Sequence, residues 1–258
     1  MIELKSINAG YKSKTVLHNV SVSFSKASLT CIIGENGSGK STLLKTIAGI
    51  LPAKSGDIII DGQNASNLSR KDVAKKISYL SQFNRTSDMT VAQTVLHGRF
   101  AHLNYPRVYS AEDKRIASDC MEQLGISELA NIPLSELSGG MQQNTYIAMA
   151  LAGRSDYILL DEPTSYLDVS NKFRLMHTLK ALCSQGKGIV AVMHDLTLAL
   201  QFADNIVVVH SNGSLTKLST EQLFTSDIIP NTFGVKIGRH TIENEHIYYL
   251  YQTKNKHL

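Results

Sequence analysis

One stretch near the N-terminus reads Gly34-Glu35-Asn36-Gly37-Ser38-Gly39-Lys40-Ser41-Thr42. It has the form G-x-x-x-x-G-K-[ST], in which small loop residues let successive backbone N–H groups converge on the β- and γ-phosphates of a nucleotide. The continuous apolar run Leu29 to Ile33 before it predicts a strand buried on both faces, and Ser41 to Ile50 after it has the spacing of a helix. A strand, a loop and a helix in this order predict a helix N-terminus that faces the phosphates of a nucleoside triphosphate.

Acidic and imidazole side chains follow two later apolar runs. Tyr157 to Leu160 is followed by Asp161 and Glu162, and Ile189 to Met193 is followed by His194. Because ligands of open α/β sheets bind at the carboxyl ends of the strands, we expect Asp161 to bind Mg²⁺, directly or through water. Glu162 is the expected general base for the attacking water, and His194 is expected to hydrogen bond to the γ-phosphate and position that water. The alternatives are a solvated Asp-Glu turn and a histidine satisfied inside the core.

Three further side chains complete the expected phosphoryl-transfer site. Lys40 would contact the β- and γ-phosphates, and the Ser41 hydroxyl would ligate Mg²⁺. Gln82 follows the predicted strand Ile77 to Leu80, and its amide can ligate Mg²⁺ or orient water, but on its own it is an ordinary surface glutamine. A nucleoside triphosphate with Mg²⁺ is therefore expected in this site.

Strands and helices alternate along the chain, which indicates a mainly parallel sheet with helices on its faces. Val16 to Phe24 instead alternates apolar and polar residues, as a half-exposed antiparallel strand does. Ile206 to Val209, followed by Asn212-Gly213, predicts a strand that enters a tight turn. The sequence contains no internal repeat, so it predicts one nucleotide-binding unit.

A different pattern begins at Ser110. This residue is a suitable N-cap, with Asp113 three positions later, and apolar residues then follow at helical spacing until Gly125. We interpret the segment from about Gln82 to Ser135 as a helical insertion. The apolar residues of its helix are Ile116, Ala117, Cys120, Met121 and Leu124.

The composition excludes several classes of protein. The 258 residues are 43% apolar, enough for a substantial core, and a net charge of +4 without a basic run does not indicate nucleic-acid binding. Three cysteines, far apart and in no metal-binding spacing, suit a reducing compartment. No run approaches the about 18 apolar residues of a membrane span, and residues 1–5 do not begin a signal peptide, so we expect a cytoplasmic chain unless a partner holds it at a membrane.

The segment Leu137-Ser138-Gly139-Gly140 narrows the class of nucleotide-binding protein. Ordinary P-loop kinases and small GTPases lack it, and its place after a phosphate loop resembles the ABC-type ATPases. The resemblance implies an α/β fold, a P-loop NTPase of ABC type, with a mainly parallel sheet core, an antiparallel β subdomain and an inserted helical subdomain. It implies a single ABC ATPase domain over residues 1–258, with a catalytic core of 1–82 and about 155–235. The helical subdomain with the signature motif is expected at about 83–154, and a C-terminal extension at about 236–258.

The same resemblance implies that the nucleotide is ATP, bound with Mg²⁺, and that Gln82 ligates the Mg²⁺ or orients the water, and it assigns residues to the nucleotide. An aromatic residue at the position of Tyr11 stacks on adenine in ABC ATPases, although Tyr11 would also fit simple packing on the antiparallel sheet. The implied ATP-binding residues are Tyr11, Gly34, Glu35, Asn36, Gly37, Ser38, Gly39, Lys40, Ser41, Thr42, Ser138, Gly139 and Gly140.

The resemblance also implies a dimer. Ser138, on the helical insertion, would not reach the nucleotide held by Lys40 of the same chain. Two copies are therefore expected to pair head to tail in an ATP-sandwich dimer, so that Ser138 and the following helix N-terminus bind the γ-phosphate held by the partner. Ser165-Tyr166-Leu167-Asp168 corresponds to the D-loop that crosses this interface.

The signature departs from the usual family pattern at two positions. The family commonly continues with Gln and then basic residues, whereas Met141-Gln142-Gln143-Asn144 follows here. Met141 removes a polar contact and Asn144 removes a positive charge, while Gln143 keeps the amide that is frequent at its position.

Further segments resemble the ATPase subunits of iron–siderophore, haem and cobalamin importers. We therefore expect ATP hydrolysis that powers import of a metal chelate, most specifically a ferric siderophore, with haem or cobalamin as the alternative cargo. The segments are Met89-Thr90-Val91, Val95-Leu96-His97-Gly98-Arg99 with His102, Ser110-Ala111-Glu112-Asp113, Thr164-Ser165-Tyr166-Leu167-Asp168, His194-Asp195-Leu196-Thr197-Leu198-Ala199 and Phe233-Gly234-Val235.

This subfamily implies particular partners. They are transmembrane permease subunits, a second copy of the chain and, indirectly, a substrate-binding protein, with the ATPase peripheral on the cytoplasmic face of the inner membrane. The alternative classes are an exporter ATPase and a stand-alone soluble ABC protein acting on DNA or ribosomes, which commonly has two ATPase units or a long coiled-coil insertion. Residues 83–102 are the expected coupling surface to the permease, with Arg99 either part of it or an internal packing or capping residue.

Overall fold

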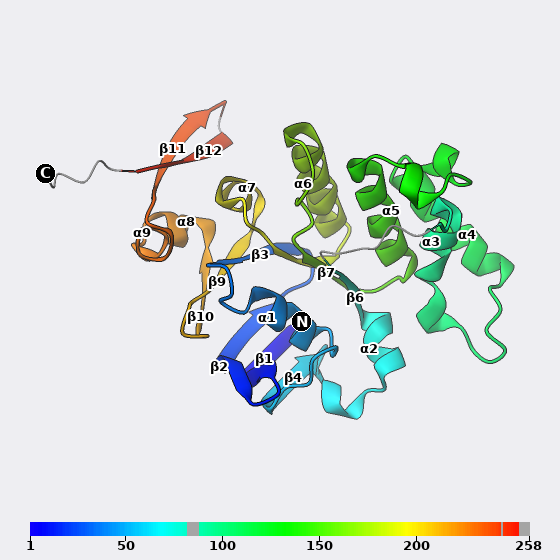
Figure 1. The fold of residues 1–258 in the computed structure, drawn as a ribbon, viewed down its shortest axis with the longest axis horizontal. Helices are drawn as coiled ribbons and strands as arrows, with labels where there is room; N and C mark the ends of the chain where they lie inside the picture. The colour runs from blue at the N-terminus through cyan, green and yellow to red at the C-terminus, as the bar shows by residue number, and fades with distance from the viewer. Residues whose placement is uncertain (82–87, 244, 253–258) are drawn as a thin grey trace, which may run out of the picture.

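A mainly parallel sheet forms the centre of the molecule. The computed structural model describes residues 1–81, 88–243 and 245–252, so the predicted Gln82 lies outside the described residues. Within them the central sheet has the strand order β10-β9-β3-β8-β7-β6 (Figure 1), and only the β9–β10 pair is antiparallel. This confirms the predicted fold class. The strands are β3 (Ser28–Gly34), β6 (Ile77–Leu80), β7 (Tyr157–Asp161), β8 (Gly188–Val192), β9 (Asn205–Val209) and β10 (Leu215–Ser219).

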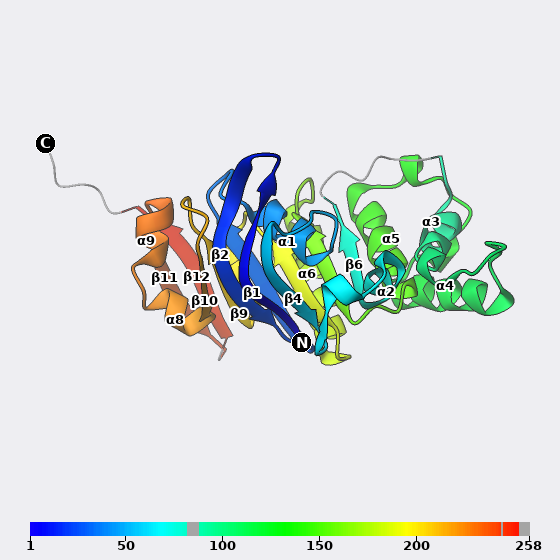
Figure 2. The ribbon, with the colours of Figure 1, turned by 90° about the horizontal axis from the view of Figure 1, so that it is seen from below.

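An antiparallel sheet and one helix cover the first face of the central sheet (Figures 1 and 2). The strand order of this antiparallel sheet is β2-β1-β4-β5, and β2 contains the antiparallel strand predicted at Val16 to Phe24. Phe24 of this sheet, Leu43 of the helix and Ile32 of β3 belong to one buried apolar cluster. The elements are β1 (Ile2–Tyr11), β2 (Lys14–Phe24), β4 (Ser55–Ile60), β5 (Gln63–Asn64) and α1 (Lys40–Ile47).

Helices cover the opposite face. Cys31 and Ile33 flank Ile32 in β3 but pack into the second apolar cluster, with helices on that side. Successive side chains of a strand point to opposite faces, so the continuous apolar run in β3 supplies both clusters. The helices that contact the strands of this face are α6 (Val169–Ser184) and α7 (Leu196–Phe202), whereas α3 (Val91–His97), α4 (Ala111–Gln123) and α5 (Gly139–Ala152) pack on one another beyond the edge strand β6 (Figures 1 and 2).

The remaining elements lie at the two sides of this core. Helix α2 precedes β6, and α8, α9 and a hairpin follow β10 at the side of the molecule away from α3 and α4 (Figure 1). The hairpin and the helices before it are not predicted by the sequence pattern. The elements are η1 (Ala65–Asn67), α2 (Arg70–Lys76), η2 (Phe100–His102), η3 (Ser127–Leu129), η4 (Leu134–Glu136), α8 (Thr220–Phe224), α9 (Ile228–Phe233), β11 (Lys236–Ile242) and β12 (Glu245–Tyr251).

The helix predicted after Ser110 is α4. The Ser110 hydroxyl accepts a hydrogen bond from the Asp113 N–H at 3.1 Å, and the Asp113 carboxylate accepts one from the Ser110 N–H at 3.0 Å. This reciprocal pair is the capping box that the sequence predicts. Ile116 and Met121 on the apolar side of the helix are buried, and Gly125 ends it with a φ of +66°.

Arg99 is an internal residue rather than part of an exposed coupling surface. It is only 7% exposed, its Nε donates to Asp113 Oδ1 at 2.9 Å, and its Nη1 donates to the Ala152 carbonyl at 2.9 Å. The Ser110 hydroxyl and the Arg99 guanidinium together lower the pKa of Asp113 to about 2. The interpretation of Arg99 as a coupling residue is therefore wrong, because its guanidinium joins α3, α4 and α5 from inside.

We expect Arg99→Glu to lower the free energy of unfolding by roughly 3–5 kcal/mol, since it leaves Asp113 buried beside a second negative charge. Urea unfolding followed by circular dichroism measures this change. The control is Arg115→Glu on α4, whose side chain is 62% exposed and whose loss should change stability by less than about 1 kcal/mol. Equal effects of the two substitutions would contradict the internal role.

The three cysteine side chains lie inside the protein. Cys31, Cys120 and Cys183 are all buried and unpaired, and burial raises the pKa of the Cys31 thiol to about 12 and that of Cys183 to about 11. Among the described residues, no helix combines the length and the apolar character that crossing a bilayer requires.

Candidate active site

The predicted phosphate loop joins β3 to α1, and two of its glycines are required by its shape. Gly34 and Gly39 have φ values of +152° and +110°, a region in which L side chains are strained. A Cβ on Gly34 would lie 2.3 Å from the Val209 carbonyl oxygen, and one on Gly39 would lie 2.8 Å from Val16 Cγ1. The loop therefore passes against β9 on one side and β2 on the other, and only glycine fits at these two positions.

Lys40 lies over this loop. Its Nζ donates to the carbonyl oxygens of Gly34 at 3.0 Å and Glu35 at 2.9 Å, and the residue is buried. Burial lowers the pKa of Lys40, while the nearby carboxylates of Glu162 and Asp161 oppose that shift. The ammonium is thus held by two loop carbonyls at the N-terminus of α1.

The Ser38 side chain indicates that the loop is suited to an anionic group. Its hydroxyl is buried, and among the described residues it has no hydrogen-bond partner. A buried hydroxyl without a partner is costly, whereas a phosphate oxygen in the loop would satisfy it. Gly37 has open space around its Cα, so the loop is accessible from that side. The orphan hydroxyl, the two tight glycines and the lysine fit a bound triphosphate. Thr42, the last residue of the motif, is buried on α1.

Asp161 is the last residue of β7, and its carboxylate accepts hydrogen bonds from two hydroxyl groups. The Ser41 hydroxyl donates to Oδ1 at 2.9 Å, and the Tyr79 hydroxyl donates to Oδ2 at 3.2 Å. Burial, followed by the charge of Asp161, raises the pKa of Tyr79, which keeps it a neutral donor. The oxygen atoms of Ser41 and Asp161 are hard ligands of the kind that Mg²⁺ prefers. Tyr79 is not predicted from the sequence, in which only its place in the predicted strand Ile77 to Leu80 could have pointed to it; the pairing of β6 with β7 brings it to Asp161.

Glu162 and His194 are in direct contact. His194 Nε2 lies 2.6 Å from Glu162 Oε1, and the Ser165 hydroxyl donates to Glu162 Oε2 at 3.2 Å. The side chain of Glu162 is 13% exposed and that of His194 is 46% exposed. Glu162 also has a φ of +55°, so the chain turns sharply as it leaves Asp161. Both carboxylate oxygens are held, which fixes the direction of a candidate base.

The strand order explains why these residues meet. Strand β8 pairs with both β3 and β7, so His194, just after β8, lies between the phosphate loop and Asp161-Glu162. All three segments leave the carboxyl ends of parallel strands, where the sequence predicts ligand binding. Tyr11 ends β1 and is 47% exposed, so its ring is available for stacking, and its role with adenine stays a prediction.

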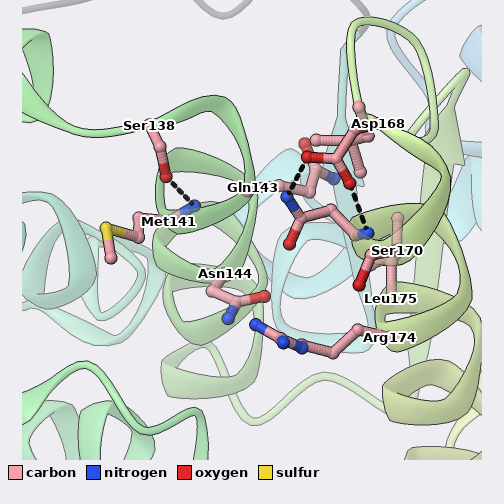
Figure 3. Close-up of a pocket in the computed structure, with 11 residues that line it drawn as sticks. Ser138, Met141, Gln143, Asn144, Asp168, Ser170, Arg174 and Leu175 are labelled. Atoms are coloured by element: carbon pink, nitrogen blue, oxygen red, sulfur yellow. Dashed lines mark hydrogen bonds between the residues drawn. The ribbon is translucent and has the colours of Figure 1, made fainter.

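The signature segment lies at the N-terminus of α5, on another part of the surface. Ser138 is its N-cap, and the Ser138 hydroxyl accepts a hydrogen bond from the Met141 N–H at 3.4 Å (Figure 3). In Figures 1 and 2, α5 lies apart from α1, with β6 between them. The signature and the phosphate loop of one chain are thus separate sites.

A cavity of about 350 Å³ opens beside Ser138, between α5 and α6. Its far wall begins at Asp168, whose carboxylate accepts hydrogen bonds from the N–H and the side-chain amide of Asn171, both at 2.8 Å. The lining residues are Ser138, Gly140, Met141, Gln143, Asn144, Leu167, Asp168, Ser170, Asn171, Arg174 and Leu175.

Arg174 lies near Asn144, the signature position at which the family commonly has a basic residue. It projects from α6 toward Asn144 across this cavity (Figure 3). The positive charge that Asn144 lacks is therefore present in the same cavity, supplied by a different helix.

Comparisons with known proteins agree with this geometry. Residues 17–165 match the family described as ABC transporter. The chain is 33% identical to the achromobactin transport ATP-binding protein CbrD of Dickeya dadantii, covering 91% of this chain and 88% of that protein. It is also 33% identical to the iron(3+)-hydroxamate import ATP-binding protein FhuC of Bacillus subtilis, with the same coverage.

Two solved structures show the same fold. An ABC transporter described as metal-chelate type, in an inward-facing conformation, matches with a TM-score of 0.85 at 24% identity, over 98% of both chains. The dimeric structure of MJ0796, a bacterial ABC transporter cassette, matches with a TM-score of 0.73 at 29% identity, over 85% of this chain and 99% of that one. With the phosphate loop, the signature helix and the family match in agreement, the chain belongs to the ABC transporter family and is one of its ATP-binding cassette ATPases.

Proposed function

We propose that this ATPase powers the import of a metal chelate, most specifically a ferric siderophore, through a separate membrane permease. The observation that carries the proposal is the extent of the similarity to CbrD and FhuC. It covers 91% of this chain rather than the ATP-binding motifs alone. We place the chain on the cytoplasmic face of the membrane, on permease subunits that receive the chelate from a binding protein.

The residues around the phosphate loop suit ATP with Mg²⁺. Lys40 would exchange its two loop carbonyls for the β- and γ-phosphates, and the Ser38 hydroxyl would gain a partner. Ser41 and Asp161, already hydrogen bonded to each other, would hold Mg²⁺, with Gln82 as a further ligand. When bound, Mg²⁺ supplies positive charge that offsets the charge developing on the phosphates.

Glu162 is the proposed general base. Its carboxylate would accept a proton from the attacking water, and the Ser165 hydroxyl would go on holding its Oε2 during the reaction. This arrangement points the carboxylate before any substrate arrives, so little reorganisation is needed during the reaction. His194 would turn to the γ-phosphate once the nucleotide occupies the loop.

We further propose that two copies pair head to tail, each Ser138 facing the phosphate loop of its partner. The separation of α5 from α1 within one chain and the dimeric form of the MJ0796 cassette support this. Residues 1–82 and about 155–235 would then carry the phosphate loop and base, and about 83–154 the signature.

Ser138→Arg should leave ATP binding by the isolated chain intact but lower hydrolysis by about 100-fold or more, because a bulky cation beside the partner's phosphate blocks closure. Fluorescent-nucleotide titration and phosphate release measure the two effects. Ser127→Arg, also on an exposed serine of the helical region, is the control and should keep both activities. Loss of ATP binding in the isolated Ser138→Arg chain would contradict the head-to-tail arrangement.

Uptake by a deletion strain tests the cargo. We expect loss of labelled ferric siderophore uptake, restored by wild type and not by Glu162→Gln. Labelled haem and cobalamin are measured in parallel. Undiminished siderophore uptake with loss of haem or cobalamin uptake would assign the chain to a sister system, and copurification with ribosomes instead of a permease would overturn the transport proposal.

A further inference from the structure

Tyr79 reaches Asp161 from the neighbouring strand of the sheet. In the parallel pair β6–β7 (Figure 1), Tyr79 lies opposite Leu159, two residues before Asp161. Alternate residues of a strand point to the same face, so Tyr79, Leu159 and Asp161 share the face that α1 covers. The length of the tyrosine side chain then carries its hydroxyl to Asp161 Oδ2, to which it donates at 3.2 Å.

The ring of Tyr79 is held in place by packing. It is partly buried against the apolar cluster that contains Ile77, Leu159 and, from α1, Leu43. A tyrosine side chain has only two χ angles, so a packed ring loses little entropy when its hydroxyl forms a hydrogen bond. The hydroxyl is therefore a donor at a fixed position before any ligand binds.

The two oxygens of the Asp161 carboxylate are held by two different kinds of group. Asp161 is 5% exposed, so a carboxylate oxygen without a partner would be costly there. Ser41, which donates to Oδ1 at 2.9 Å, is itself a candidate metal ligand. Tyr79 remains a neutral donor, because burial and the charge of Asp161 raise its pKa. The bond from Tyr79 is thus one that metal binding need not break.

A carboxylate that binds a metal is more effective when its direction is fixed. Mg²⁺ requires near-ideal octahedral geometry, and a carboxylate free to rotate presents its oxygens in many directions. Hydrogen-bond partners of metal-binding carboxylates remove this freedom, and their loss typically lowers metal affinity about 10–100-fold. The Tyr79 hydroxyl has the place and the rigidity for this role.

We propose that Tyr79 is a positioning residue for Mg²⁺. Its hydroxyl fixes Asp161 Oδ2, so that the carboxylate presents Oδ1, beside Ser41, to the metal or to water bound to it. The proposal rests on the metal site of the proposed function. Since Tyr79 lies on β6 rather than in the phosphate loop, it acts on metal affinity and not on binding of the nucleotide alone.

Tyr79→Phe tests this role, because it removes the hydroxyl and keeps the packed ring. The probe is Mn²⁺, followed by electron paramagnetic resonance, with ATP-loaded chains that carry Glu162→Gln so that ATP is not consumed. We expect the dissociation constant of Mn²⁺ to rise about tenfold in Tyr79→Phe. Binding of a fluorescent ATP analogue without metal should not change. With Glu162 intact, the Mg²⁺ concentration for half-maximal hydrolysis should rise by the same factor, with kcat at saturating Mg²⁺ retained.

Tyr157→Phe is the matched control. Tyr157 lies in β7, its hydroxyl donates to Asp61 Oδ1 at 2.9 Å, and burial raises its pKa as well. Both variants lose one tyrosine–aspartate hydrogen bond, so their thermal unfolding temperatures should fall by similar amounts. Only Tyr79→Phe should weaken Mn²⁺ binding. Equal Mn²⁺ affinity of the two variants would show that the Tyr79 hydroxyl only supports the fold, which overturns the proposal.

Asp161→Asn separates failure of this role from failure of the metal site. If Asp161→Asn weakens Mn²⁺ binding and Tyr79→Phe does not, the role of Tyr79 is wrong and the metal site stands. If Asp161→Asn binds Mn²⁺ as tightly as the chain with Asp161 intact, Asp161 is not a ligand. The proposed metal site and the role of Tyr79 then fail together.

Discussion

The Glu162→Gln variant will bind ATP and Mg²⁺ but hydrolyse ATP about 10²–10⁴-fold more slowly than the wild type, because an amide cannot take the proton of the attacking water. The amide oxygen can still accept a hydrogen bond from the Ser165 hydroxyl, so the turn from residue 162 to 165 should keep its shape. Since ATP is no longer consumed, the closed dimer should accumulate. Phosphate release gives the rate, and size-exclusion chromatography with ATP gives the dimer.

Glu243→Gln is the matched control for this substitution. Glu243 also has a left-handed backbone, with a φ of +50°, but it lies at the end of β11. The control should hydrolyse ATP at the wild-type rate. Wild-type turnover in Glu162→Gln, without an accumulated dimer, would remove Glu162 from the role of base.

The Lys40→Ala variant should lose ATP turnover, with kcat/KM falling by about 100-fold or more, because no other cation enters the phosphate loop among the described contacts. Lys45→Ala on the same helix is the control, since this residue lies in the last turn of α1, away from the loop. Nucleotide titration separates loss of binding from loss of chemistry. Hydrolysis by Lys40→Ala at the rate of Lys45→Ala would exclude the phosphate-loop assignment.

The sequence predicts the central part of this site because its signals are local. The strand, loop and helix around Lys40 are contiguous, and Asp161, Glu162 and His194 each follow an apolar run that ends at the same edge of the sheet. Position along the chain is then enough to bring them together.

Other features depend on partners far away in sequence. Tyr79 donates to Asp161 from a neighbouring strand, and the pairing of those two strands sets this contact rather than any pattern around the tyrosine. The Arg99 guanidinium is buried because Asp113 and the Ala152 carbonyl accept its hydrogen bonds. An arginine in the sequence gives no local sign of such burial. The β11–β12 hairpin was missed because nothing local marks its packing against α7.

The position of β3 in the sheet has a consequence for how the protein folds while the ribosome synthesises it. Its two neighbours are β8 and β9, which end at Val192 and Val209, whereas β3 itself ends at Gly34. At ribosomal rates of about 5–20 residues per second, β3 waits on the order of ten seconds or more for the strands that bury it. An apolar strand unpaired for so long is exposed to aggregation and to chaperones. The phosphate loop, among the first segments to leave the ribosome, is among the last to reach its working shape.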